Sequence, residues 1–271
     1  MILGLGTYAL AWSIGVPGYT LINPWKLDDV IAYAIRKKLN CIQIADNLPL
    51  HTLSEKELEK LNHDALTHNL RLEAGTRGLQ PHNLEQYFKI ASRINSPILR
   101  VVIDSADYSP SVDEIIRTIK LYVPELEERN VKLAIENHDR LKASTFVHII
   151  ESVGSPMVGI CLDTVNSFGQ AEGLETAIEQ LIPYTINLHI KDFQIRRHDH
   201  NMGFSITGTP AGEGRLPLPE LINRLRVLGK CESAILELWP EPETTANETA
   251  EKEQEWVHKS LDYLKKIFEA S

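Results

Sequence analysis

The chain has 271 residues, of which 43% are hydrophobic and 24% are charged, and its formal net charge at pH 7 is −9. This length and hydrophobic content can build one large core, and barrels of alternating strands and helices reach this size as a single domain. The acidic balance argues against a general nucleic-acid-binding protein, which would carry an excess of basic residues.

Targeting and redox features favour a cytoplasmic protein that does not bind membranes. The first basic residue is Lys26, so the positively charged start of a secretory signal is missing. No apolar run approaches the length needed to span a membrane. The three cysteines, Cys41, Cys161 and Cys231, lie in apolar surroundings without CxxC spacing, and we expect them to be reduced and packed.

Apolar runs of strand length alternate with segments of helical periodicity along the whole chain. The first run contains Gly4 and Gly6, and the helix after it has Asp28 and Asp29 in its first turn, where the helix dipole favours acidic residues. The predicted strands are residues 2–9, 41–46, 71–76, 97–104, 131–137, 158–163, 185–191 and 233–238. The predicted helices are residues 24–38, a segment that begins at the capping-box pair Ser54 and Glu57, and residues 83–94, 111–129, 144–152, 174–182, 218–228 and 251–268.

Eight strand–helix units without a dividing boundary predict an α/β fold, a single (β/α)8 TIM barrel domain over residues 1–271. One segment interrupts the regular alternation. Residues 193–216 separate the seventh strand from its helix, and we expect an irregular loop there. Loops of this length inside a compact domain are typically functional or disordered.

Each of the last four predicted strands ends in a side chain that can bind a metal ion: Glu136, Asp163, His189 and Glu237. The carboxyl ends of all barrel strands face the same rim, and a charge buried there without a partner is unfavourable. Sharing one cation would satisfy all four side chains. This donor set suits one divalent ion, Mn²⁺, Mg²⁺, Co²⁺ or Zn²⁺. The alternative is four unrelated polar groups at strand ends.

The other half of the rim offers candidate walls for a substrate. They are Tyr8, Trp12, Asp46, Asn47, Thr76 and Arg100. His51, in the loop after the second strand, is a further candidate substrate contact, or else helps to start the next helix. Aromatic side chains at the rim either stack on a sugar or pack as ordinary rim residues.

The loop that leaves the seventh strand carries the candidate anion contacts. Arg196 or Arg197 is expected to reach inward and to clamp a phosphate or carboxylate with two parallel hydrogen bonds. Alternatively, the two arginines point opposite ways, one to solvent and one into an ion pair. His200 is a candidate substrate contact, and with His198 it forms a pair that could hold a second metal ion.

Two nearby features have weaker signals. Lys191, shortly after His189, is expected to point away from the barrel centre. The glycine-rich stretch at residues 208–216 could cradle a phosphate through backbone N–H groups, but turn requirements explain its glycines equally well.

The strings IEN at Glu136, LDT-x-N at Asp163, H-x-KD at His189 and G-x-G-x-L at Gly212 resemble those of the xylose isomerase-like TIM barrel superfamily, and in particular its sugar phosphate isomerase/epimerase family. That superfamily also holds inosose dehydratases, 3-dehydroshikimate dehydratases and endonuclease IV. The resemblance covers the whole chain. It implies that Glu136 and Glu237 each hold the metal through one oxygen and serve as the catalytic acid/base pair, while Asp163 and His189 are plain ligands.

The chain departs from several relatives at one position of this pattern. They carry a histidine three residues after the aspartate, where this chain has Asn166. An asparagine can still hydrogen-bond a substrate hydroxyl, but it cannot relay a proton or readily support a second metal ion.

The expected chemistry is the removal of a proton next to a carbonyl group. A divalent ion that binds a carbonyl oxygen and the adjacent hydroxyl lowers the pKa of the C–H between them and stabilises an enediolate. The leading prediction is therefore an isomerase or epimerase of a sugar, sugar phosphate or sugar acid.

The same ligands also serve other reactions. A metal-dependent lyase is the alternative, either a 3-oxo sugar acid decarboxylase or a keto-polyol dehydratase. An endonuclease IV-like repair enzyme is remote, because the chain lacks a basic DNA-binding face and further His ligands. A sugar sensor is remote because it would have no reason to keep two glutamates on the ion. The expected partner is a small carbohydrate-derived substrate. The oligomeric state, a homo-oligomer included, is left open.

Overall fold

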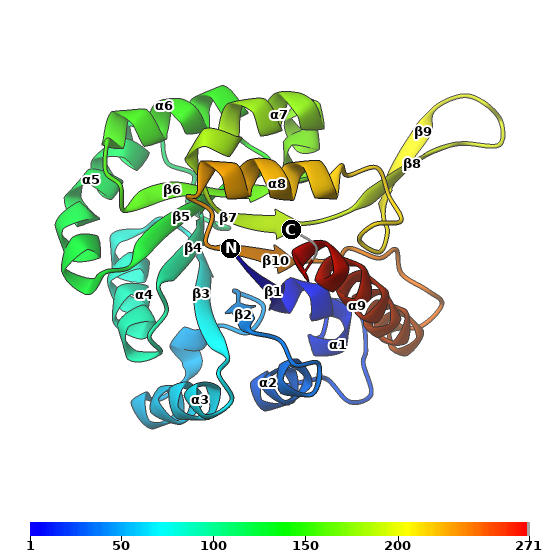
Figure 1. The fold of residues 1–271 in the computed structure, drawn as a ribbon, viewed down its shortest axis with the longest axis horizontal. Coiled ribbons are helices and arrows are strands. Elements are labelled where there is room, and N and C mark those ends of the chain that lie inside the picture. The colour runs from blue at the N-terminus through cyan, green and yellow to red at the C-terminus, as the bar shows by residue number, and fades with distance from the viewer. Residues whose placement is uncertain (270–271) are drawn as a thin grey trace.

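The computed structural model describes residues 1–269, so the last two residues of the predicted domain lie outside the described part. Eight parallel strands close into a barrel in the order β1-β10-β7-β6-β5-β4-β3-β2, and helices surround it (Figure 1). The barrel strands are β1 (Ile2–Gly6), β2 (Cys41–Ile44), β3 (Arg71–Arg77), β4 (Ile98–Val102), β5 (Lys132–Glu136), β6 (Val158–Asp163), β7 (Thr185–Ile190) and β10 (Ser233–Leu236). The predicted TIM barrel is thus confirmed.

The helices follow the predicted alternation. They are α1 (Ala11–Ile14), α2 (Leu27–Arg36), α3 (Glu55–Thr67), α4 (Pro81–Arg93), α5 (Val112–Arg129), α6 (Ala143–Val153), α7 (Leu174–Leu181), α8 (Leu218–Leu228) and α9 (Ala246–Glu269). Ser54 caps α3 as its sequence predicts: its side chain accepts a hydrogen bond from the Glu57 N–H, while the Glu57 carboxylate accepts from the Ser54 N–H. Within the described residues, no helix combines the length and apolarity needed to cross a membrane.

Burial on both faces explains the near-continuous apolar runs of the strands. Every residue of β4, β6 and β7 is buried. One face of each strand packs under the helices, and the other fills the barrel interior. All three cysteines are buried free thiols, in agreement with the expected packing role.

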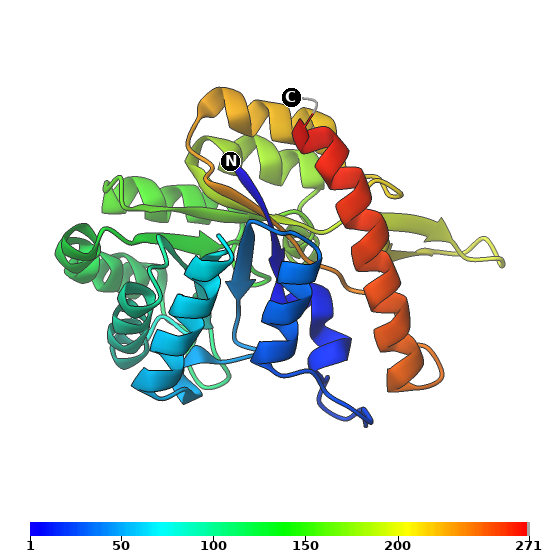
Figure 2. The same cartoon turned by 60° about the horizontal axis from the view of Figure 1, so that its bottom comes forward.

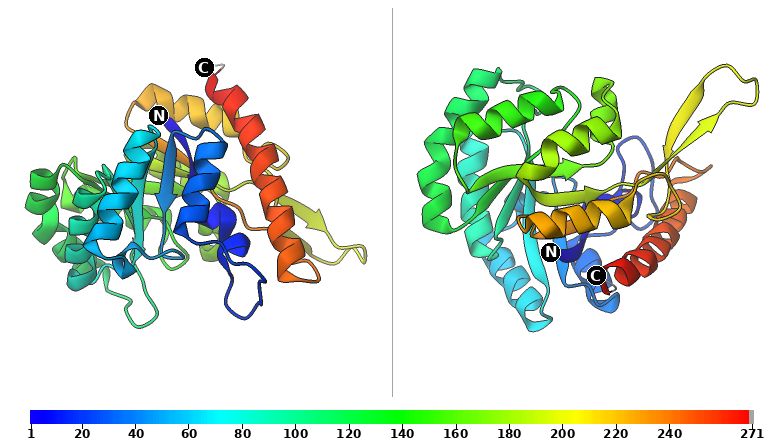
Figure 3. Two further views of the ribbon diagram at one scale, coloured as in Figure 1. Left: turned by 90° about the horizontal axis from the view of Figure 1, so that it is seen from below. Right: turned by 45° about the horizontal axis from the view of Figure 1, so that its top comes forward.

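The segment between β7 and α8 was expected to be an irregular loop, and this expectation is wrong. It contains an antiparallel hairpin of β8 (Phe193–Arg197) and β9 (Phe204–Gly208), which projects outward from the barrel (Figures 1 and 3). Phe193, Ile195 and Ile206 alternate with polar residues in the two-residue period of a strand. Gly203, with φ of 95°, provides the left-handed backbone that the turn requires.

The first and last helices are joined through one buried carboxylate. Glu253 of α9 accepts hydrogen bonds from the backbone N–H groups of Trp12 and Ser13 and from the Ser13 hydroxyl, each at 2.9 Å. It therefore satisfies amide groups in the first turn of α1 that have no partner within that helix. Figure 2 shows α9 running alongside α1, next to the point where β1 and β10 close the barrel.

Candidate metal centre

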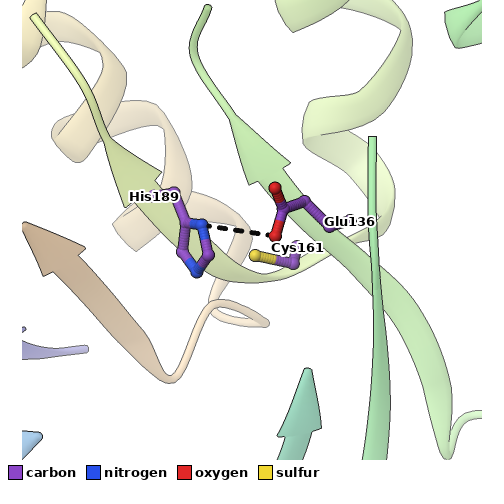
Figure 4. Close-up of side chains that lie close together, drawn as sticks. All are labelled: Glu136, Cys161 and His189. Carbon is purple, nitrogen blue, oxygen red and sulfur yellow. Dashed lines mark ion pairs between the residues drawn. The ribbon is translucent and has the colours of Figure 1, made fainter. Parts of the chain in front are cut away.

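The structure brings the four predicted metal ligands together at one end of the barrel. Glu136 and Asp163 end β5 and β6, His189 lies near the end of β7, and Glu237 directly follows β10. All four side chains are buried. The His189 Nδ1 atom lies 3.6 Å from Glu136 Oε2, 3.9 Å from Asp163 Oδ2 and 3.4 Å from Glu237 Oε1. Figure 4 shows His189 and Glu136 facing each other across the end of the barrel.

Asn137 joins the IEN and LDT strings. Its side-chain N–H donates to the Asp163 carbonyl at 3.0 Å, and its side-chain oxygen accepts from the Asp163 N–H at 2.7 Å. Asp163 in turn accepts the N–H groups of Val165 and Asn166 through Oδ1, both at 2.9 Å. These bonds orient the carboxylate, and they leave its Oδ2 atom facing the other ligands.

Two cations reach the same carboxylates. The Lys191 Nζ atom lies 2.8 Å from Asp163 Oδ2 and 2.9 Å from Glu237 Oε2, while Arg100 Nε lies 2.8 Å from Glu136 Oε2. The expectation that Lys191 points away from the barrel centre is therefore wrong. Lys191 follows His189 by two residues, and side chains two residues apart along an extended chain lie on the same side, so its ammonium group reaches the ligands.

These charges shape the electrostatics of the site. Burial alone raises the pKa of Glu237, but His189, Lys191 and Arg100 outweigh it and lower the pKa to about 2. Burial alone lowers the pKa of Lys191, but the carboxylates of Asp163, Glu237 and Glu136 outweigh it and raise the pKa well above its ordinary value. Glu237 and Lys191 therefore stay charged at neutral pH.

The donor atoms fit a divalent cation. Among residues 1–269, His189 Nδ1 is buried without a hydrogen-bond partner, and it faces three carboxylates. Donor atoms of Asp163, His189 and Glu237 all lie within 4.8 Å of one another. Oxygen donors with one imidazole suit Mn²⁺, Mg²⁺, Co²⁺ or Zn²⁺. The arrangement could place such an ion beside the cavity described below.

Cys161 lies next to Glu136 and His189 but is poorly suited to be a ligand (Figure 4). Its thiol donates a hydrogen bond to the Asn187 side-chain oxygen at 3.1 Å. Burial raises the pKa of the thiol well above its ordinary value, so the sulfur keeps its proton, whereas metals bind the thiolate. Cys161 and Asn187 each precede a predicted ligand by two residues, and this spacing is the signal that could have placed them at the site.

A cavity of about 360 Å³ opens beside the cluster and has the size of a small-molecule site. It is lined by Tyr8, Asp139, Val165, Asn166, Phe168, Gly169, Lys191, Ile206, Leu238 and Trp239. Asn166 donates to Glu136 Oε1 at 2.9 Å, and the Tyr8 hydroxyl donates to Asp46 Oδ2 at 3.1 Å. The predicted substrate contacts Tyr8 and Asn166 therefore lie where a substrate could reach the metal ligands.

Other candidate substrate contacts lie elsewhere. Arg196, Arg197 and His200 are exposed on the hairpin, where Arg196 donates to the Gln194 side chain and Arg197 to the Asn201 carbonyl. The hairpin carries them away from the cluster, because β8 and β9 extend outward instead of folding over the rim (Figure 3).

Trp12 and His51 also lie outside the cavity. The Trp12 ring packs edge-on against Tyr19, with ring centroids 4.8 Å apart. His51 lies in a 3-10 turn before α3, with its Nδ1 atom 3.0 Å from the Tyr87 hydroxyl. This contact joins His51 to α4, whereas Ser54 caps α3.

The glycine-rich stretch at residues 208–216 does not offer free amide groups to a phosphate. The buried Asp192 carboxylate accepts the N–H groups of Gly212, Gly214 and Leu216, at 2.9 to 3.0 Å. A Cβ atom at Gly214 would lie only 2.1 Å from Asp192 Oδ1, so this glycine is needed for the close approach of the carboxylate. The stretch is thus a turn that is held from within the chain.

Comparison with known proteins places these observations in a family. The model of the xylose isomerase-like TIM barrel family matches residues 48–267. The chain is 32% identical over 266 residues to the 3-oxo-isoapionate decarboxylase of Pectobacterium atrosepticum, a match that covers 97% of this chain and 95% of that protein.

Solved structures share the fold. D-psicose 3-epimerase from Clostridium cellulolyticum H10, in complex with D-tagatose, has a TM-score of 0.72 and 15% identity over 98% of this chain and 99% of its own. A xylose isomerase-like TIM barrel protein from Mycobacterium smegmatis, in complex with magnesium, has a TM-score of 0.67 and 14% identity over 97% of this chain and 96% of its own. The strand-end motifs, the barrel and the family match agree: the chain belongs to the xylose isomerase-like TIM barrel family.

Proposed function

We propose that this chain is a divalent-metal-dependent decarboxylase of a 3-oxo sugar acid. Similarity to a 3-oxo-isoapionate decarboxylase over nearly the whole chain supports the reaction class. The observation that carries the proposal is the presence of two cations, the buried Arg100 and the partly buried Lys191, among the metal ligands. They would favour an anionic substrate over a neutral sugar.

The charge balance of the cluster supports an anionic substrate. With Glu136, Asp163 and Glu237 ionised, the cluster has three negative charges, against two positive charges on Lys191 and Arg100. Arg100 also contacts Asp46 at 3.3 Å, and the charge of Asp46 is matched by Arg77 at 3.4 Å. A divalent ion would change this balance from −1 to +1. A monoanionic substrate would then neutralise the buried site, whereas a neutral sugar would leave an uncompensated buried charge.

Decarboxylation of a 3-oxo acid breaks the bond between the carboxylate carbon and the carbon next to the carbonyl group. The electron pair of this bond moves toward the carbonyl, carbon dioxide leaves, and a proton must be added to the carbon. A divalent ion held by Glu136, Asp163, His189 and Glu237 would supply a Lewis acid for this carbonyl oxygen. Asn166 and Tyr8 would orient the substrate hydroxyls from the walls of the cavity.

Lys191 is the proposed proton donor. Its Nζ atom carries a proton, and the residue lines the cavity beside the ligands. The carboxylates raise the pKa of Lys191, and a divalent ion bound to them would counter this shift, so that the ammonium group could release its proton. Asp163 and Glu237 hold the ammonium group in place at 2.8 and 2.9 Å. A positioned general acid of this kind typically contributes about 10² to 10⁴ in rate.

The carboxylates are less suited to the epimerase that the sequence placed first. Epimerisation needs a base on each face of the reacting carbon. Glu136 is engaged by Arg100 on one oxygen and by Asn166 on the other, and Glu237 Oε2 is held by Lys191 at 2.9 Å. A carboxylate that is paired with a cation is a weaker base. The assignment of Glu136 and Glu237 as an acid/base pair stays a prediction, and in this proposal they act as ligands.

The test follows carbon dioxide release and solvent-deuterium exchange in parallel, with Mn²⁺ present. We expect release of carbon dioxide from 3-oxo-isoapionate and no deuterium incorporation into neutral ketoses such as D-psicose. Lys191→Met should lower the rate of release by at least about a hundredfold. Lys56→Met, at an exposed site on α3, is the matched control and should be fully active. Deuterium exchange into ketoses without carbon dioxide release from the acid would favour the epimerase instead.

A further inference from the structure

A chain of buried polar side chains continues from His189 through the barrel interior, away from the cavity. Gln43 of β2, Glu73 of β3 and Asn187 of β7 are each 0% exposed. Buried amides and carboxylates need hydrogen-bond partners, because unpaired ones are unfavourable by about 1 to 3 kcal/mol each. Their partners therefore constrain which atom of each side chain donates and which accepts.

The donor directions begin at the far end of this chain. Arg71 Nη2 lies 3.1 Å from Glu73 Oε1 and 2.9 Å from Glu232 Oε2. Burial raises the pKa of Glu73, and the Arg71 guanidinium opposes this shift. An ionised Glu73 can only accept hydrogen bonds, so the group that faces its other oxygen must donate.

Gln43 is that donor. Its Nε2 group donates to Glu73 Oε2 and to Asn187 Oδ1, both at 3.1 Å. The opposite amide orientation would place the Gln43 oxygen against these two acceptors. Asn187 is itself fixed, because its Nδ2 group donates to the Ser233 hydroxyl at 2.7 Å and its oxygen accepts the Cys161 thiol. The amide oxygen of Gln43 is thereby directed at His189.

The Gln43 oxygen lies 2.7 Å from His189 Nε2. An amide oxygen cannot donate, so Nε2 must carry the proton, and the lone pair of a neutral imidazole is left on Nδ1. Nδ1 is the atom that faces Glu136, Asp163 and Glu237. Without Gln43, the three carboxylates at 3.4 to 3.9 Å would attract the proton to Nδ1 and block metal binding there.

We propose that Gln43 is a positioning residue that fixes the metal-binding tautomer of His189, and that the Arg71–Glu73 pair holds Gln43 in the required orientation. The structure thus assigns a metal-tuning role to side chains at the opposite end of the barrel interior. This role concerns the metal site, and it is independent of whether the reaction is decarboxylation or epimerisation.

The first test reads the tautomer directly. Long-range ¹H–¹⁵N spectra of metal-free protein with ¹⁵N-labelled histidine, at high pH, distinguish a protonated from an unprotonated ring nitrogen. Comparison with His189→Gln identifies the His189 signals. We expect Nε2 to be protonated in the native protein and Nδ1 to be protonated in Gln43→Met, which keeps the side-chain volume but lacks the amide. A native His189 with its proton on Nδ1, or on both nitrogens, would overturn the proposal.

The second test measures Mn²⁺ affinity by calorimetry. Gln43→Met should weaken Mn²⁺ binding by about 10- to 100-fold, as is typical when a partner of a metal ligand is lost. Ile42→Val, a buried change at the neighbouring position of β2, is the matched control and should bind Mn²⁺ as the native chain does. Native affinity in Gln43→Met together with a retained Nε2 proton would refute the positioning role.

Glu73→Gln provides an independent variant if Gln43→Met does not fold. It leaves Gln43 in place but replaces an obligatory acceptor with a group that can also donate. The orientation of Gln43 should then no longer be unique, so both His189 tautomers should appear and Mn²⁺ affinity should fall. A single Nε2-protonated form with unchanged affinity would show that Glu73 does not control Gln43.

Discussion

Gly6 leaves room for one of the metal-site side chains. A Cβ atom at this position would lie 3.0 Å from Glu237 Cγ and 3.2 Å from its Oε1, and 3.0 Å from Cγ2 of Ile235. These separations are shorter than ordinary van der Waals contacts. The glycine in β1 thus sets where the carboxylate of a strand far away in the sequence can lie.

Gly6→Ala should therefore displace the Glu237 carboxylate. We expect Mn²⁺ affinity, measured by calorimetry, to fall by about tenfold, within the range seen for changes next to metal ligands. Gly173→Ala is the matched control, because a Cβ atom there meets nothing within 4 Å. Equal Mn²⁺ affinity in the two variants would mean that Glu237 adapts freely.

For single residues, the sequence shows which strand-end side chains meet at the metal site, but it does not show which side chains from elsewhere also reach it. The positions of Glu136, Asp163, His189 and Glu237 follow from strand ends that share one rim. Lys191 could have been placed, because it follows His189 by two residues, the spacing of side chains on one side of a strand. Gln43 looked like any polar residue in an apolar run, and its role depends on partners that are distant in sequence.

The hairpin shows the same limit at the scale of an element. Residues 193–208 contain alternating apolar and polar positions, but two short strands can pair, or remain a loop, with nearly the same local pattern. The pairing of β8 with β9 makes an arm that leaves the barrel, instead of a loop from which Arg196 or Arg197 reaches inward. Arg196 and Arg197 lie on this arm. They are close to His189 in the sequence but not in space.

The junction between α1 and α9 gives the protein a pH-dependent contribution to stability. Burial raises the pKa of Glu253 to about 7, against the hydrogen bonds from Trp12 and Ser13, which lower it. Between pH 4.5, the ordinary pKa of a glutamate, and about pH 7, the folded state therefore still binds a proton that the unfolded state has released. The stabilisation from this group is complete below that range and is lost as the pH rises through it.

We expect this loss to reach about 3 kcal/mol in the free energy of unfolding. Denaturant unfolding at a series of pH values from about 4.5 to 8 gives the free energy of unfolding of the native chain and of Glu253→Gln. The loss appears as a difference between the two proteins in how this free energy changes with pH. The native chain should lose stability relative to the variant as the pH rises. Parallel pH profiles for the two proteins would show that the three hydrogen bonds keep Glu253 ionised throughout.

For the whole molecule, the metal centre acts as a cross-link between strands. Its ligands come from β5, β6 and β7 and from the residue after β10, which form one continuous half of the barrel. An ion that binds only the folded state stabilises it by an amount that depends on its concentration, about 2.7 kcal/mol at a hundred times the dissociation constant. The metal content of the protein should therefore change the stability of the entire barrel against unfolding.

Addition of Mn²⁺ to metal-free protein should raise the midpoint of thermal unfolding, and a chelator should reverse the change. Asp163→Asn should lose most of this response, because the neutral amide is a weaker ligand than the carboxylate. Asp262→Asn, at a half-exposed site on α9, should respond as the native chain does. A midpoint that does not depend on Mn²⁺ in the native chain would contradict the assignment of the metal site.

The overall architecture was accessible from the sequence because it is repetitive. Eight apolar runs separated by helical segments leave few alternatives to a barrel, and buried parallel strands are the least ambiguous part of that pattern. The predicted ends of helices and strands differ from the observed ones by a few residues. The first strand, predicted over residues 2–9, ends at Gly6, before the 3-10 turn at Thr7–Leu10. The substrate walls were harder to predict, because their position depends on loops whose course is set by tertiary contacts.

The carboxylate of Glu253 also has a consequence for biosynthesis. During translation Ser13 emerges from the ribosome long before Glu253, because 240 positions separate them. Until Glu253 has emerged, the amides of Trp12 and Ser13 lack this partner, and β1 lacks β10, its neighbour in the closed barrel, until β10 has emerged. Contacts between such distant positions close slowly, because the entropy of a long loop must be lost first. The nascent chain should thus complete its barrel only after β10 and α9 have emerged from the ribosome, with its earliest strand among the last to be enclosed.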